Sequence, residues 1–174
     1  SYDVVPGHHD LEKLNLKELV DQYYPNFYLG IANHARLAGQ ESMAIMDKEF
    51  GYVTPSNDFK QSYIHPTFNS WRWENADFWI KYSKENNLIL RIHGPISPQS
   101  SKWVKEDNRT AAQLSKMLDE YMTALCLRYG NEPRVKWMDV VNEVIAVQKV
   151  KDPIANYNVG DWFGPRQGVD KWEN

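Results

Sequence analysis

Residues 135–143 read VKWMDVVNE, and this stretch decides the fold. Its first seven residues form a short, mostly apolar run that predicts a buried strand over 135–141. A polar pair, Asn142 and Glu143, follows the strand directly. A carboxyl group at the mouth of an apolar strand loses solvation, which tends to raise its pKa and suits a general acid near neutral pH. The alternative is a loop glutamate that caps a helix or pairs with a nearby lysine.

Working back from this strand, the chain alternates between short apolar runs and amphipathic segments. The apolar runs predict three earlier strands, over 27–32, 51–54 and 88–92. Helical spacing predicts helices over 11–22, 40–50, 74–85 and 110–129. Thr110 and Gln113 form a capping-box pattern at the start of the last helix. Strands that alternate with helices predict βαβ units and a parallel sheet, which is the α/β class.

The carboxyl ends of parallel strands are where such folds place their chemistry. Polar residues follow all four predicted strands: Asn33, His34 and Arg36 after the first, Asn57 and Lys60 after the second, His93 after the third, and Asn142 with Glu143 after the fourth. Taken alone, His93 is more typical of a structural histidine than of a ligand. Lys60 is compatible with binding a polyhydroxylated ligand or with a solvated loop. The stronger indication of a functional site is that all these residues stand at the same place relative to the predicted strands, just after the strand end.

Composition excludes several classes of protein. The 174 residues carry 20 Lys and Arg against 23 Asp and Glu, so the net charge of −3 argues against nucleic-acid or anionic-membrane partners held by bulk electrostatics. No apolar run approaches the ~20 residues of a transmembrane helix. Seven Trp and ten Tyr suit either a core or a surface that stacks on sugars. Cys126, the single cysteine, is expected to be a small buried hydrophobe. Asp139, inside the fourth strand, is expected to be paired within the fold.

Residues 137–143 resemble the W-D-V-V-N-E signature of glycoside hydrolase family 10, the endo-β-1,4-xylanase family, with Met138 as an extra residue. Three more segments resemble motifs of that family and occur in its order. Residues 53–60 (VTPSNDFK) are similar to T-x-E-N-x-x-K, residues 68–77 (FNSWRWENAD) to F-x-W-x-x-A-D, and residues 90–93 (LRIH) to a strand ending in R-x-H. The four motifs occur between residues 53 and 143 of the chain.

This resemblance implies a (β/α)₈ TIM barrel, of which residues 1–174 supply about the first four β/α units. It also implies retaining hydrolysis of internal β-1,4 linkages of xylan or a related β-glycan. Glu143 would be the general acid/base, and Asn142 would bind the 2-hydroxyl of the sugar at the cleavage point. His93, Lys60 and Asn57 would line the sugar subsites on the non-reducing side.

The chain departs from the family pattern at two places. Ser56 stands where the family usually carries Glu, and residues 94–98 (GPISP) stand where it usually continues T-L-V-W-H. The resemblance further implies that the nucleophilic Glu lies on a seventh strand, whereas only four strands are predicted here. We therefore expect the 174 residues alone to be inactive, with the C-terminal half of the barrel as their partner.

The remaining expectations concern context and alternatives. The resemblance implies a secreted or periplasmic protein, because polymeric substrates lie outside the cell, although residues 1–6 do not read as a signal peptide. We expect no cofactor and no metal, since the sequence has no phosphate-binding glycine loop, no G-x-S-x-G and no H-E-x-x-H. A non-catalytic carbohydrate-binding protein and an unrelated metal-dependent hydrolase are the two alternatives.

Overall fold

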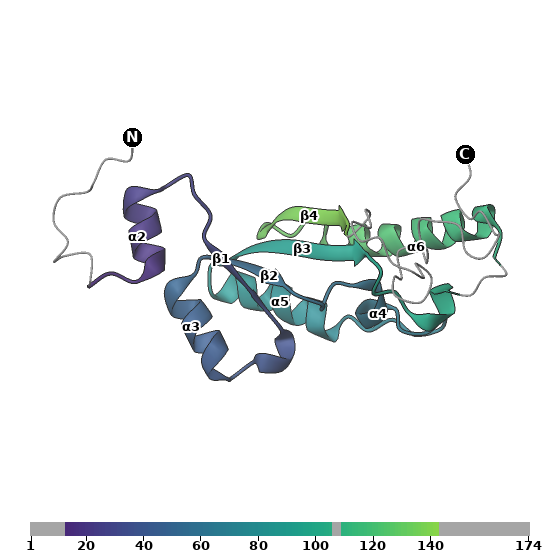
Figure 1. Cartoon of the computed structure of the whole chain (residues 1–174), viewed down its shortest axis with the longest axis horizontal. Coiled ribbons are helices and arrows are strands. Elements are labelled where there is room, and N and C mark those ends of the chain that lie inside the picture. The colour runs from purple at the N-terminus through teal and green to yellow at the C-terminus, as the bar shows by residue number, and fades with distance from the viewer. Residues whose placement is uncertain (1–12, 106–108, 143–174) are drawn as a thin grey trace, which may run out of the picture.

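The computed structural model of the chain describes residues 13–105 and 109–142 (Figure 1). In chain order the elements are α2 (Leu16–Tyr23), β1 (Gly30–Asn33), the 3-10 helix η1 (Ala35–Leu37), α3 (Glu41–Glu49), β2 (Tyr52–Pro55), α4 (Gln61–Ile64), α5 (Glu74–Glu85), β3 (Ile89–Ile96), the 3-10 helix η2 (Lys102–Lys105), α6 (Ala111–Tyr129) and β4 (Val135–Val141). Strands alternate with helices throughout, which confirms the α/β class.

The four strands form one sheet in the order β1-β2-β3-β4, so neighbours in sequence are also neighbours in space. All three pairings are parallel. In this register Ile31, Val53, Leu90 and Val135 form one row across the sheet. Because the strands are parallel, their carboxyl ends meet at the same edge, which is where the sequence places its polar residues.

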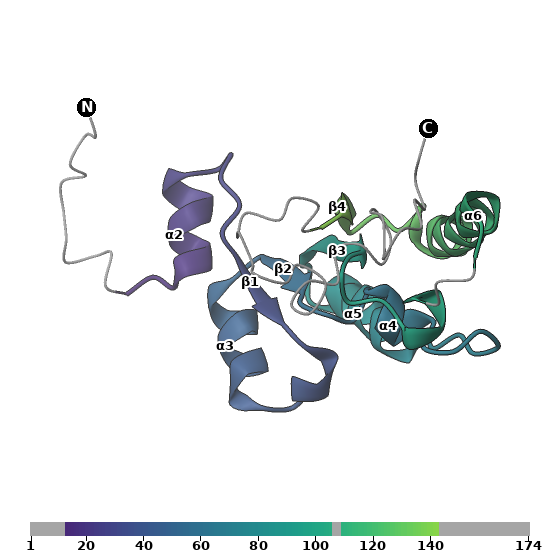
Figure 2. The same cartoon turned by 45° about the vertical axis from the view of Figure 1, so that its right-hand side comes forward.

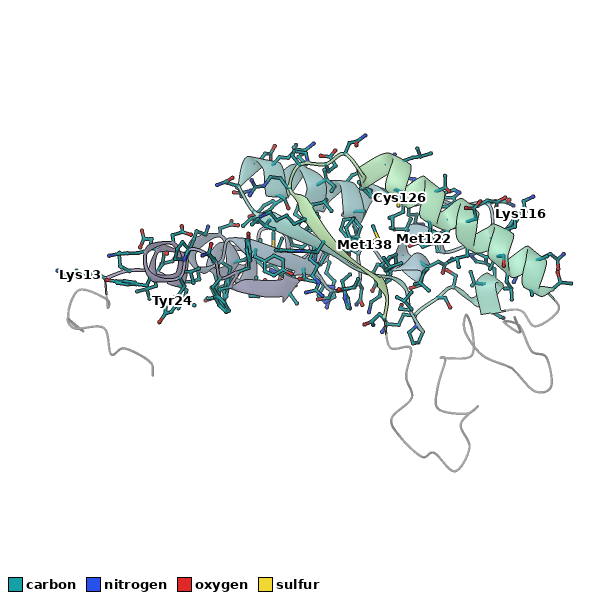
Figure 3. All side chains as sticks on the ribbon, turned by 90° about the horizontal axis from the view of Figure 1, so that it is seen from above. Lys13, Tyr24, Lys116, Met122, Cys126 and Met138 are labelled. Carbon is teal, nitrogen blue, oxygen red and sulfur yellow. The ribbon has the colours of Figure 1, made fainter. Side chains whose placement is uncertain are left out.

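One face of the sheet is packed against helices and forms the core. Figures 1 and 2 show α3 and α5 below the strands in both views. The side chains at the centre of this core, all without exposed surface, are Met46, Val53, Trp79, Leu90, Ile92 and Leu125. Met122 of α6 and Met138 of β4 pack against the same cluster and lie between helix and strand (Figure 3). Each fully buried side chain of this kind contributes ~1.5–3 kcal/mol, so this layer is the main source of stability.

The opposite face of the sheet is concave and partly exposed among the described residues. Tyr28 lies just before the first strand and Trp137 near the start of the last, yet their rings meet edge-on at 5.0 Å. Tyr52 of β2 also meets Trp137, at 5.5 Å, and the Lys136 ammonium donates to the Tyr28 hydroxyl at 2.8 Å. The segment before β1 therefore reaches across to β4, which requires a strongly curved sheet. Such curvature is what closing strands into a barrel demands.

Several element boundaries agree with the sequence-based predictions. Helix α5 and strand β4 have the predicted bounds, and Thr110 and Gln113 form the predicted capping box of α6. Helix α2 is shorter than predicted. It begins at Leu16, because Asn15 and Glu18 form a capping box that fixes the first turn of the helix at this position. Residues 1–12 lie outside the described part of the chain.

The prediction for Cys126 is wrong. Its side chain is exposed on α6, where Figure 3 labels it. The buried face of α6 follows Leu114, Met117, Tyr121 and Leu125. A residue one position beyond Leu125 is rotated by ~100° from that face, so an apolar neighbourhood in sequence does not bury it. Within the described residues no helix combines the length and apolarity needed to cross a membrane.

Candidate active site

Lys60 and Asn142 lie beyond the carboxyl ends of β2 and β4, as predicted. His93 does not follow the third strand as predicted, because β3 continues to Ile96, and it lies within that strand. Gly94 of β3 marks where Lys60 and Asn142 meet, because a Cβ placed on it would lie 3.5 Å from both the Lys60 Cε and the Asn142 Cβ. Gly94 has φ +60°, a conformation that side chains with a Cβ rarely adopt. Asn142 is held by its backbone N–H, which donates to the Ile96 carbonyl at 2.9 Å. The structure thus brings together Lys60 and Asn142, beside the strand that carries His93.

Lys60 is buried, with 7% of its surface exposed, and its ammonium donates to the Gln99 side-chain oxygen. A buried ammonium needs polar partners, because desolvation of a charge is costly. Gln99 lies in the loop after β3 and was not predicted from the sequence. The only available signal was its place seven residues beyond the predicted strand 88–92, which does not distinguish it from other polar loop residues. Lys60 and Gln99 together offer donors and an acceptor suited to hydroxyl groups.

Asn57 lies in the turn before Lys60, and its carbonyl accepts from the Lys60 backbone N–H at 2.9 Å. Between them lies Asp58, with only 2% of its surface exposed. Its carboxylate accepts three hydrogen bonds, from Ala35 N at 2.8 Å, Asn75 Nδ2 at 3.0 Å and Trp79 Nε1 at 2.6 Å. Asp58 therefore ties the turn that carries Asn57 and Lys60 to η1 and α5. This role of Asp58 was not predicted from the sequence.

His93 points its Nδ1 at the Asp139 carboxylate of the next strand, with 2.8 Å between Nδ1 and Oδ2. The Arg91 guanidinium holds the same carboxylate, with Nε 2.9 Å from each oxygen. Burial alone would raise the pKa of Asp139, but the hydrogen bonds from Arg91 and His93 outweigh it and hold that pKa below its usual value. The expectation that Asp139 is paired within the fold is confirmed.

Aromatic residues near this edge pack against one another. The His65 ring stacks on Trp71 with 3.8 Å between centroids and meets Trp103 edge-on at 4.7 Å. Trp71 also stacks on Trp73, at 5.3 Å. Burial lowers the pKa of His65, more than its hydrogen bond to the Ser70 carbonyl raises it. The structure favours packing over sugar stacking for these tryptophans, because their rings face other rings.

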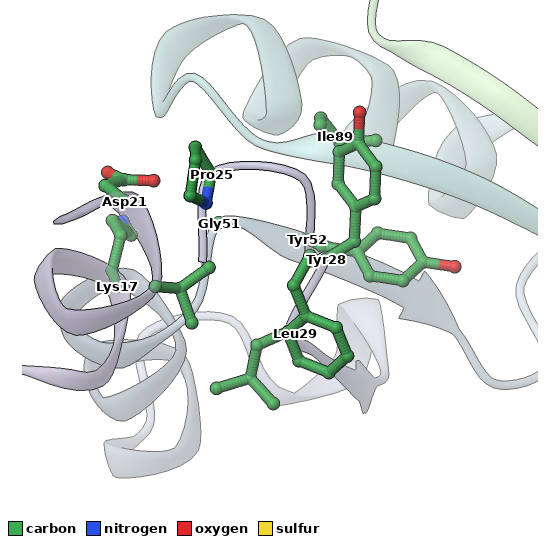
Figure 4. A pocket seen from close by; sticks show the side chains of 10 residues that line it. Lys17, Asp21, Pro25, Tyr28, Leu29, Gly51, Tyr52 and Ile89 are labelled. Carbon is green, nitrogen blue, oxygen red and sulfur yellow. The ribbon is translucent and has the colours of Figure 1, made fainter. Parts of the chain in front are cut away.

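Two of the hollows formed by the described residues lie near the sheet. One, of about 120 Å³, is shown in Figure 4 and is lined by residues of α2 and by Gly51, Tyr52 and Ile89 at the amino ends of β2 and β3. It lies at the end of the strands opposite to Lys60 and Asn142. The other opens on the concave face beside Arg91, Trp137 and Asp139. The concave face is thus accessible next to His93.

Glu143, the predicted acid/base, lies outside the described residues. Among the residues that the structure describes, no three His, Cys, Asp or Glu side chains gather into a group that could hold a metal ion. The predicted site residues that the structure describes are Asn57 and Lys60 after β2, His93 on β3, and Asn142 after β4.

Comparison with known proteins is consistent with this arrangement. The family model described as Glycosyl hydrolase family 10 matches residues 15–164. The chain is 26% identical over 141 residues to the endo-beta-1,4-xylanase Xyn10C of Cellvibrio japonicus, covering 75% of this chain and 23% of that protein. It is also 26% identical over 149 residues to a thermostable celloxylanase of Thermoclostridium stercorarium, covering 75% of this chain and 37% of the relative.

Among solved structures, the endo-1,4-beta-xylanase of Caldicellulosiruptor owensensis matches with 26% identity and a TM-score of 0.69, over 86% of this chain and 45% of that one. The native form of CbXyn10B matches with 27% identity and a TM-score of 0.68, over 80% and 42%. The chain thus spans less than half the length of these relatives. With a family model matched over most of its length, the chain belongs to glycosyl hydrolase family 10, and its sheet and helices form part of a (β/α)₈ barrel.

Proposed function

We propose that the chain is the N-terminal half of the catalytic barrel of a retaining glycoside hydrolase that cleaves internal β-1,4 linkages of xylan or a related β-glycan. The observation that carries this proposal is the convergence of Lys60 and Asn142 on Gly94, beside His93, at the carboxyl ends of the strands. Two of these side chains offer amide or ammonium donors, which suit sugar hydroxyls. Among the similar structures, a mutant in complex with xylotriose is 25% identical to this chain, with a TM-score of 0.69.

In this proposal Glu143 is the general acid/base. It protonates the glycosidic oxygen as the leaving sugar departs, and then deprotonates the water that releases the glycosyl-enzyme. Asn142 binds the hydroxyl next to the reacting carbon, a contact that tightens in the transition state. His93, Lys60 and Asn57 hold the sugars on the non-reducing side. Polymeric xylan lies outside cells, so we place the protein in the secreted or periplasmic space.

A retaining mechanism needs a second carboxylate ~5–5.5 Å from the first, to act as the nucleophile. We propose that the C-terminal half of the barrel supplies it and covers the concave face of the sheet. Two features support this partner. Trp137 on that face is 38% exposed, and in the described chain β1 and β4 each pair with one strand only. Parallel strands are normally paired and covered on both faces. The 174 residues alone are accordingly inactive.

The test compares the native protein with the isolated chain. The intact mass of the native protein is measured, and both samples are assayed for the release of reducing ends from xylan. We expect native material that contains a second half-barrel, covalently or as a subunit, and is active, whereas the isolated chain is not. In the active form Glu143→Gln lowers kcat by at least ~10²-fold, the usual share of general acid–base catalysis.

Glu132→Gln is the matched control, because Glu132 lies in the turn between α6 and β4, away from the candidate active site, and pairs with Lys84 of α5. It should leave turnover unchanged. Full activity of a proven 174-residue monomer would refute the need for a second half, and unchanged turnover by Glu143→Gln would refute its role. Binding of xylo-oligosaccharides without turnover by the native material would instead favour a non-catalytic carbohydrate-binding protein.

A further inference from the structure

We propose that Arg91 and Asp139 form a clamp that fixes the tautomer of His93, with the proton on Nδ1 and with Nε2 presented as a hydrogen-bond acceptor. Arg91 and Asp139 are positioning residues here, because they act on the ligand only through His93. The role of the acceptor in binding a sugar hydroxyl rests on the proposed function. The tautomer itself does not.

The geometry of the clamp follows from the pairing of β3 with β4. His93 is the register partner of Asp139, and Arg91 precedes His93 by two positions, so the three side chains share the concave face. Arg91 donates through Nε to both carboxylate oxygens, at 2.9 Å each, and through Nη2 to Oδ1. Oδ2 also receives His93 Nδ1 at 2.8 Å. Irregular register flanks the segment on both sides, between Leu90 and Arg91 and between His93 and Ile96.

The donors and acceptors of these three groups allow only one position for the ring proton of a neutral His93. A guanidinium has only donors, and an ionised carboxylate has only acceptors. The contact between Asp139 and His93 is therefore made by a proton on Nδ1. A neutral imidazole carries one ring proton, so Nε2 must then be an acceptor. The low pKa of Asp139 is consistent with an ionised carboxylate at neutral pH.

An Nε2 acceptor would select for a hydroxyl that donates. A sugar with a free hydroxyl at this position satisfies the ring nitrogen, whereas an alkylated or acylated hydroxyl leaves it unpaired and is rejected. The clamp thus contributes to substrate choice without touching the sugar.

The test is tautomer assignment by NMR in the full 174-residue chain labelled with ¹⁵N-histidine, without substrate, at a pH ~2 units above the ordinary histidine pKa of ~6.5. The sequence has five histidines, so His93→Gln assigns the signals. We expect long-range ¹H–¹⁵N correlations of the Nδ1–H form for His93 in the wild type.

Asp139→Asn should move the proton to Nε2. Because Arg91 has only donors, it draws the new amide oxygen toward itself and leaves the amide N–H facing His93 Nδ1, which must then accept. Asp77→Asn is the matched control, because Asp77 accepts from Arg128 Nε at 2.9 Å and Tyr129 Oη at 2.8 Å, between α5 and α6. It should leave the His93 signals unchanged.

An Nε2–H form in the wild type, or an unchanged Nδ1–H form in folded Asp139→Asn, overturns the proposal. If Asp139→Asn does not fold, the wild-type spectrum decides by itself. A chain that shows the predicted tautomer but whose native form never cleaves xylan would overturn the proposed function and leave the clamp standing.

Discussion

Replacing Asp58 should separate the effect of its charge from the effect of its hydrogen bonds. Two donors share its Oδ2 atom, the backbone N–H of Ala35 and the indole N–H of Trp79, and its Oδ1 atom accepts from the side chain of Asn75. In Asp58→Asn the amide oxygen can replace Oδ2 and keep the first two bonds. In Asp58→Ala all three bonds are lost.

The magnitudes follow from burial. Trp79 is fully buried, so its indole N–H stays without an acceptor in Asp58→Ala, at a cost of ~2 kcal/mol, and the half-buried Ala35 N–H adds ~1 kcal/mol. Asn75 is exposed and can bind water instead. We therefore expect Asp58→Ala to lower the free energy of unfolding by ~3 kcal/mol. Asp58→Asn should cost ~1 kcal/mol or less, since only the exposed Asn75 must turn its amide.

The assay is urea unfolding followed by tryptophan fluorescence, with the free energy of unfolding extrapolated to water. A double-mutant cycle with Trp79→Phe isolates the Asp58–Trp79 bond from the cavity that the smaller ring leaves. Equal losses for Asp58→Asn and Asp58→Ala would refute the reasoning, because the charge alone would then matter. A coupling energy under ~0.5 kcal/mol in the cycle would show that the indole bond is dispensable.

Three further outcomes follow from the structure. Gly94→Ala places a Cβ in the left-handed region, so thermal unfolding should show a loss of ~1–2 kcal/mol, and an unchanged midpoint would contradict it. The hydrogen bond from Arg128 is the main cause that lowers the pKa of Asp77, so this contribution to stability is present above the unfolded-state pKa of ~3.9 and lost as the pH falls through the folded one. Acid titration of the unfolding free energy should thus be flatter for Asp77→Asn, and identical curves would count against the pair. Leu90→Ala should cost ~2–5 kcal/mol in urea unfolding, while Leu127→Ala, at a site 81% exposed, should stay within ~0.5 kcal/mol; comparable losses would mean that the core is misplaced.

The sequence predicted helices and strands correctly where apolar residues repeat at a regular spacing over many positions, or where a turn marks the end of the element. Helix α5 and strand β4 have the predicted bounds because Trp79 and its neighbours repeat at helical spacing and Val135 follows a turn. Strand β1 begins at Gly30 rather than at 27, because Phe27 and Tyr28 are apolar but exposed and lead into the strand. The residue type alone does not tell whether an aromatic side chain such as Phe27 or Tyr28 lies in a strand or on the exposed segment that leads into it.

The site was predictable to the extent that it depends on topology. Parallel strands place their carboxyl ends together, and this alone predicts that Lys60 and Asn142 are neighbours. The contacts of Asp58 and Gln99 were not predictable, because they depend on how two loops pack. The bond between Arg91 and Asp139 joins residues 48 positions apart and depends on an irregular strand register, which cannot be counted from the sequence.

The strand order has a consequence for synthesis on the ribosome. Because β1, β2, β3 and β4 pair in the order in which they are translated, each new strand can dock on one that has already emerged. Sequential pairing keeps the loops to be closed short, which favours fast folding. The sheet can therefore grow as the chain lengthens, and β4 is the edge that a nascent chain presents to whatever segment follows it.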